Sequence, residues 1–193
     1  VIASSIGLGP VLAQARLSAT INTFTAFPLA PWDRDTAMGA LDALARALHV
    51  EWAPGGREAL VDRLGVCIPH HVQVFWAHLQ LDARRRNVFC VRPEDVERVF
   101  RADMLGPSGH AELSHYEERL GLMLGQRLLP LAMDLLSEAA LTGSLTIPAL
   151  RQLAAEYARP QQLEVLDVLL HDGYLQLEGD RYTFPSAFLR EWW

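Results

Sequence analysis

The sequence contains no lysine, so all 17 of its basic side chains are arginine, against 23 acidic side chains. The formal net charge of −6 argues against broad binding to a phosphate backbone, although a local basic face could still contact DNA. The phosphate-binding loop of ATPases combines a glycine-rich turn with a lysine that contacts the phosphates. A chain without lysine therefore lacks this motif. The chain by itself is therefore not expected to be an enzyme, and no catalytic residue is assigned.

Cysteine and long apolar runs are also scarce. Cys67 and Cys90 lie far apart in the sequence and are expected to be two buried thiols in a reducing, cytoplasmic compartment. The apolar stretch 120–136 is interrupted by Gln126, Arg127 and Asp134, so no membrane-spanning segment and no membrane partner are expected. With 193 residues, 50% of them hydrophobic, the chain can bury the core of one large or two small domains.

The first half of the chain predicts one strand and then four helices. Val1–Ala3 is short, apolar and partly β-branched, and turn-forming residues follow it. A lone strand cannot pair its own backbone groups, so a longer protein with the rest of the sheet is expected to precede Val1. The spacing of apolar residues predicts helices at 34–48, 56–64, 69 onward and 93–104. Start signals support three of them, at Asp33, Pro69 and Pro93, and Gly65 is a stop signal for the second.

The second half predicts a different order of elements. A Gly/Pro/Ser segment at 106–109 is the expected domain boundary, and a long helix at 114–141 is expected to kink near Pro130. Helices at 146–155 and 161–171 and a hairpin of strands at 174–178 and 181–184 follow. This order is typical of a winged helix, so the predicted fold class is mainly α, with a small helical bundle followed by a winged-helix domain with a small β-hairpin.

Several stretches resemble the AAA+ ATPases related to origin-recognition and archaeal-type ATPases, including their STAND relatives. Residues 1–8 look like the last strand of the ATPase core. Residues 27–32 and 65–73 look like the crossing into the helical lid and the opening of a lid helix. Asp172-Gly-Tyr-Leu and residues 182–193 look like the end of bacterial members. The resemblance implies a core remnant at 1–27, a helical lid domain at 28–105 and a winged-helix domain at 110–193.

The same resemblance implies candidate ATP-binding residues. Ser5, with Ser4 beside it, matches the polar sensor near the γ-phosphate, and Pro69, His70 and His71 match the start of the lid helix that faces the nucleotide. The family often has an arginine near that helix, where this chain has the two histidines. The alternatives are ordinary turn serines and surface or capping histidines. ATP and magnesium are expected only in the full-length parent, whose missing N-terminal ATPase core would be a partner; neither cofactor nor metal is expected here.

A winged helix that reads DNA places its third helix in the major groove. That helix here offers Gln161 and Gln162 and no internal basic residue, with Arg151, Arg159 and Arg181 around it for phosphate contacts. DNA is thus a possible partner, and a protein partner or domain packing is favoured. The preferred hypothesis is that this chain is a regulatory region that couples the nucleotide state of an absent ATPase core to a protein or DNA partner. The alternatives are a free-standing DNA-binding regulator of the helix-turn-helix type and a protein-interaction adaptor.

The arginine run at 84–86 and the two terminal tryptophans each allow two interpretations. Arg84, Arg85 and Arg86 could contact nucleic acid, but a solvated cap at a helix C-terminus is favoured. Trp192 and Trp193 end the sequence, and exposed tryptophans are costly. They are expected to fold back on the winged helix, and the alternative is docking on the absent core or on another subunit.

Overall fold

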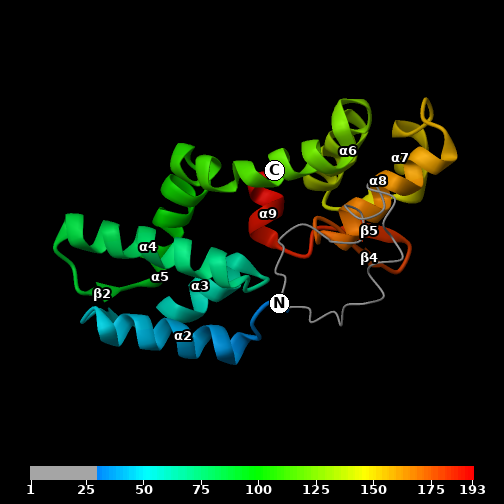
Figure 1. The fold of residues 1–193 in the computed structure, drawn as a ribbon. Coiled ribbons are helices and arrows are strands. Elements are labelled where there is room, and N and C mark those ends of the chain that lie inside the picture. The colour runs from blue at the N-terminus through cyan, green and yellow to red at the C-terminus, as the bar shows by residue number, and fades with distance from the viewer. Residues whose placement is uncertain (1–29) are drawn as a thin grey trace, which may run out of the picture. The chain divides into compact units, whose positions relative to one another are not determined.

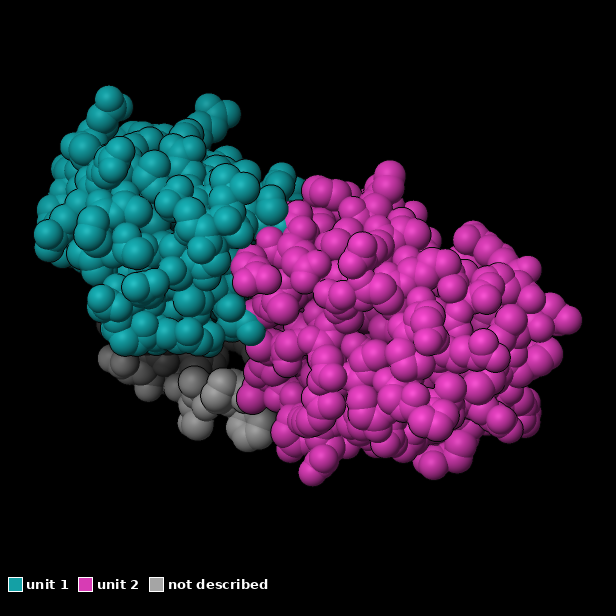
Figure 2. All heavy atoms as spheres, turned by 180° about the vertical axis from the view of Figure 1, so that it is seen from behind, with its two compact units in different colours: residues 1–28, 114–185, 193 teal, residues 29–113, 186–192 magenta. Residues whose placement is uncertain are grey.

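The computed structural model describes residues 30–193 and is mainly helical, which confirms the predicted fold class at that level. The expected strand Val1–Ala3 and the candidate residues Ser4 and Ser5 lie outside the described residues. The described chain forms two compact units (Figures 1 and 2). Unit 1 holds Ser114–Pro185 and Trp193, and unit 2 holds residues 30–113 and Ser186–Trp192.

Unit 2 contains the four helices that the sequence predicts. They are α2 (Arg34–Ala47), α3 (Gly56–Leu64), α4 (Pro69–Arg86) and α5 (Pro93–Val99), the last continued by one π-helical turn, Phe100–Met104. Asp33 caps α2 by accepting a hydrogen bond from the Thr36 N–H at 2.7 Å. Gly65 ends α3 with a φ of 69°, and a proline opens both α4 and α5. These local signals correctly predicted where the four helices begin and where α3 ends; the end of α4 at Arg86 was not predicted.

Two short strands join the helices of unit 2. β1 (Glu51–Trp52) and β2 (Cys90–Val91) pair in parallel, and both cysteines are free thiols. Two residues are too few to show a period-two pattern, so this pairing could not be predicted from the sequence. The helices enclose a core of fully buried side chains: Leu41, Leu60, Leu64, Phe75, Leu79 and Phe100.

The last helix, α9 (Ala187–Trp192), completes the core of unit 2. Phe188 is fully buried, with its ring 5.8 Å from that of Phe100. The buried Ser186 hydroxyl donates to the Leu64 carbonyl at 3.1 Å and accepts from the Leu189 N–H at 3.2 Å. The sequence prediction assigned 110–193 to one domain. In the structure residues 186–192 group with 30–113 instead, because the apolar side of α9 packs into that core.

The predicted domain boundary at 106–109 is not a loop between domains. Helix α6 (Pro107–Thr142) already begins there, and the two compact units divide within it, between Leu113 and Ser114. A Cβ atom on Gly109 would lie 1.9 Å from the Met104 carbonyl oxygen. Glycine is therefore needed for close backbone approach at this turn, and its presence does not mark a flexible linker.

The break in α6 lies at Gly125, whereas the sequence predicted a kink near Pro130. Gly125 has φ 62° and ψ 175°, a conformation that interrupts the helix and that glycine adopts without steric cost. Pro130 comes five residues later, close to the start of the second helical segment. The backbone angles stay helical at Pro130, so the proline does not break the helix there.

The rest of unit 1 follows the predicted order. α7 (Ile147–Leu153) and α8 (Arg159–His171) are followed by the hairpin of β4 (Gln176–Glu178) and β5 (Arg181–Thr183). β5 lies in the middle of a three-stranded antiparallel sheet, between β4 and the short strand β3 (Leu145–Thr146). The hairpin is confirmed, and β3 was not predicted because it spans only two residues.

Candidate interaction site

The start of α4 separates the two candidate histidines. Pro69 is the first residue of the helix and His70 is exposed, but the His71 side chain is only 1% exposed. The His71 ring lies 5.3 Å from the Phe188 ring in an edge-on arrangement. His71 is therefore a core residue of unit 2. The sequence predicts either a nucleotide contact or a surface or capping histidine at this position, and a buried side chain fits neither prediction. Of the two histidines, His70 is the one that a ligand at this helix end could reach.

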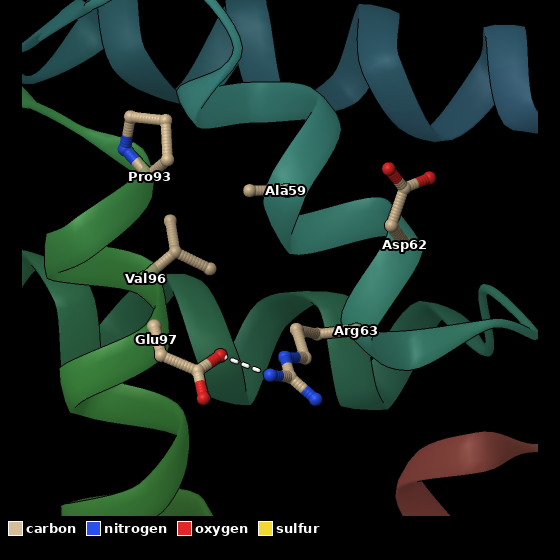
Figure 3. Close-up of a pocket in the computed structure, with 6 residues that line it drawn as sticks. All are labelled: Ala59, Asp62, Arg63, Pro93, Val96 and Glu97. Carbon is tan, nitrogen blue, oxygen red and sulfur yellow. Dashed lines mark ion pairs between the residues drawn. The ribbon is translucent and has the colours of Figure 1, made fainter.

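A shallow hollow of about 350 Å³ lies between α3 and α5, with Ala59, Asp62, Arg63, Pro93, Val96 and Glu97 around it (Figure 3). Arg63 forms an ion pair with Glu97 across the hollow and contacts Glu191 at 3.5 Å. The Arg63 guanidinium also lies 5.1 Å from the centre of the Phe100 ring. Its charge is thus already compensated, so the hollow offers no unpaired cation for an anionic ligand.

The arginine run at the end of α4 divides into two roles. Arg86 forms an ion pair with Asp95, to which Arg98 also donates at 2.8 Å. Burial alone would raise the pKa of Asp95, but hydrogen bonds from Arg86, the Arg92 backbone N–H and Arg98 together lower it to about 2. Arg86 thus joins α4 to α5. Arg84 and Arg85 remain exposed in the last turn, as expected of a solvated helix cap.

The segment Asp172-Gly-Tyr-Leu, on which the family resemblance partly rests, has a structural role in unit 1. Arg119 of α6 holds the Asp172 carboxylate through two contacts of 2.9 Å, Nε to Oδ2 and Nη2 to Oδ1. The Asp172 side chain is 2% exposed. Tyr174 is buried, and its hydroxyl donates to the Tyr116 carbonyl at 2.8 Å. Burial raises the pKa of the Tyr174 hydroxyl, which keeps it a donor. The segment therefore ties the end of α8 to α6.

The candidate DNA-binding residues are only partly available. The Gln161 side chain accepts from the Ala158 N–H at 2.9 Å, so it caps the start of α8. The Gln162 amide donates to the carbonyl oxygens of Ala154 and Tyr157, at 2.9 and 2.8 Å. Both amides hold the turn between α7 and α8, and using them to read base edges would break that turn.

The three candidate arginines remain at the surface. Arg151, Arg159 and Arg181 are exposed, with Arg181 lying 3.7 Å from Asp180. Residues 114–185 contain ten acidic side chains and five arginines. A net negative charge of this kind opposes contact with a phosphate backbone.

The exposed face of α8 is acidic and partly apolar. Leu163, Glu164 and Asp167 lie within one turn on the same side of the helix, and all three are exposed. Neither carboxylate has an ion pair among the residues that the structure describes. Leu163 is 45% exposed, and Leu177 in β4 is 57% exposed. An exposed leucine beside two carboxylates, as at Leu163, is better suited to a protein partner than to DNA.

The two terminal tryptophans fall in different units. Trp192 is buried in unit 2, with its ring 5.1 Å from the His110 ring. Trp193 belongs to unit 1, where its ring lies 6.3 Å from Tyr174 and 6.4 Å from Phe184. Trp193 therefore folds back on unit 1, the part of the chain predicted to be a winged helix, and Trp192 does not.

No family model, curated protein or solved structure matches this chain. Between residues 30 and 193, no helix is long and apolar enough to cross a bilayer. Within the same residues, no group of three or more His, Cys, Asp or Glu side chains is placed to hold a metal ion.

Proposed function

We propose that this chain is the helical lid and winged-helix region of an AAA+ or STAND-type ATPase, and that its winged-helix part binds a protein. In this proposal ATP and magnesium bind in an upstream core, and unit 2 is the lid that covers the nucleotide. Closure of the lid moves the winged helix and so changes what it can bind.

The order of elements in unit 1 supports the winged-helix part of this proposal. A helix, a short strand, two helices and a hairpin follow one another, and the first strand pairs with the second strand of the hairpin. A winged helix has this order, and α8 takes the position of the helix that enters the DNA groove. The lid assignment rests on the position of a helical bundle before this unit and on the sequence resemblance.

The observation that favours a protein partner is the chemistry of α8. Its exposed face presents Glu164 and Asp167 beside Leu163. Its two glutamines are bound to backbone groups. A DNA-reading helix needs donors for base edges and cations for phosphates. The two glutamine side chains of α8 are occupied, and its one arginine, the exposed Arg159 in the first turn, is outnumbered by Glu164 and Asp167.

The first test concerns the nucleotide. The gene sequence upstream of Val1 would be determined, and both the full product and the 193-residue chain would be titrated with a fluorescent ATP analogue. We expect a phosphate-binding loop upstream and binding by the full product only. A full product without that loop would refute the ATPase assignment.

The second test concerns DNA. A labelled DNA duplex would be titrated with the chain at about 0.01 M salt, where the Debye length of about 30 Å favours phosphate binding. We expect no change in fluorescence anisotropy. Binding that Arg151→Ala, Arg159→Ala or Arg181→Ala weakens would support the DNA-binding regulator instead.

A further inference from the structure

One edge of unit 2 carries arginines that form no ion pair with the residues that the structure describes. The C-terminal ends of α2 and α4 meet there, because the strands that follow them pair, and the Glu51 N–H donates to the Phe89 carbonyl at 2.7 Å (Figure 1). Arg46, Arg84 and Arg85 are exposed at these two ends. None of them forms an ion pair with a described residue. Glu51 is also exposed at this edge and offsets part of their charge.

Apolar side chains are also exposed at or near these helix ends. Phe89 is 65% exposed, Leu81 45% and Leu48 37%. Leu81, Arg84 and Arg85 share one face of α4, because positions i, i+3 and i+4 of a helix are neighbours. Arginine and aromatic side chains together are typical of protein interfaces. We use the name basic tip for the exposed side chains at the ends of these two helices and in the segments that follow them: Arg46, Leu48, Leu81, Arg84, Arg85 and Phe89.

The exposed face of α8 in unit 1 is the chemical complement of the basic tip. It has a leucine, Leu163, beside two carboxylates, Glu164 and Asp167. Those carboxylates, like Arg84 and Arg85, have no ion pair among the described residues. Pairing the two surfaces would therefore add ion pairs without breaking any that the structure shows.

We propose that the basic tip of one copy of this chain docks on the acidic face of α8 in a second copy. Phe89 and Leu81 pack near Leu163, and Arg84 and Arg85 pair with Glu164 and Asp167 around that apolar contact. The contact is head to tail, since it joins two different surfaces. For its α8 half, this inference rests on the protein-binding role proposed above.

The test is the mass of the full chain in solution as a function of concentration and salt. Sedimentation velocity is expected to show species above 21.5 kDa that grow with concentration. The association should weaken at about 1 M salt, where the Debye length is about 3 Å. Arg84→Glu/Arg85→Glu and Glu164→Arg/Asp167→Arg should each raise the dissociation constant at least about tenfold, since unlike charges become like charges.

A mixture of the two variants provides the decisive comparison. One variant presents an acidic tip and an acidic α8, and the other presents a basic tip and a basic α8. Each variant alone should stay a monomer, and the mixture should associate. The control is Arg127→Glu/Arg190→Glu, which changes the net charge as much as the tip variant does and reverses exposed arginines outside both surfaces. The control should associate like the wild type, and circular dichroism would verify that all variants fold.

Three results would overturn the proposal: a wild-type chain that stays monomeric, association that the tip variant leaves unchanged, or a mixture that does not associate. If the tip instead binds anionic vesicles or single-stranded DNA while the chain stays monomeric, its partner is of another class. A monomer that also binds no duplex would refute self-association and leave the protein-binding role of α8 intact. Duplex binding through α8 would refute both.

Discussion

The ion pair between Arg119 and Asp172 should respond unequally to removal of its two partners. The Asp172 side chain is 2% exposed and that of Arg119 is 20% exposed. Arg119→Met leaves a buried carboxylate without its arginine, and breaking a buried pair in this way costs about 3–5 kcal/mol. Asp172→Asn leaves an arginine that can still reach water and an amide that can still accept a hydrogen bond, so we expect a loss of about 1–2 kcal/mol.

Urea unfolding of the full chain, followed by circular dichroism, would measure these losses. Arg127→Met is the matched control, because Arg127 lies on the same helix, is exposed and has no ion pair among the described residues; we expect a change below about 0.5 kcal/mol. The double variant Arg119→Met/Asp172→Leu replaces the pair by apolar side chains. It should be more stable than Arg119→Met alone.

Two outcomes would refute this reasoning. If Arg119→Met costs less than about 1 kcal/mol, the carboxylate is not held in a buried pair as the geometry indicates. If Asp172→Asn costs more than Arg119→Met, the difference in exposure does not control the energetics. In either case the segment at 172–175 would not be the connection between α8 and α6 that its contacts describe.

Three further predictions concern stability. The pKa of Asp95 is lowered from 3.8 to about 2, so the ionised carboxylate stabilises the fold above about pH 4. This contribution of about 2 kcal/mol should disappear as the pH falls from about 4 to about 2. Asp95→Asn should therefore flatten that part of a curve of unfolding free energy against pH. Phe188→Ala empties a fully buried site in unit 2 and should cost about 3–5 kcal/mol in urea unfolding, whereas a loss below about 1 kcal/mol would mean that α9 is not part of that core. Gly125→Ala should lower the melting temperature, because the φ of Gly125 is positive. Pro130→Ala should leave the melting temperature unchanged or raise it. A larger loss from Pro130→Ala than from Gly125→Ala would place the helix break at Pro130.

The candidate nucleotide residues show the limit of local sequence patterns. The proline at the start of α4 predicted correctly where the helix begins, because a proline at the first helical position loses no hydrogen bond. The same pattern could not tell His70 from His71. That difference depends on α9, which is more than a hundred residues away in the sequence and which covers one of the two side chains.

The sequence by itself determined where the helices of unit 2 up to residue 104 begin, the hairpin and the mainly helical class. Caps, prolines, glycines and apolar spacing act within a few residues, so they can be read without a structure. The tertiary structure decided which helix completes which core, why Gly109 is glycine, and that the break in α6 falls at Gly125. It also decided which charges are already paired: Arg86 and Arg119 have buried or partly buried partners, and Arg84 and Arg85 do not. The physical reason is that packing and ion pairing join residues far apart in the chain, and no local pattern records those contacts.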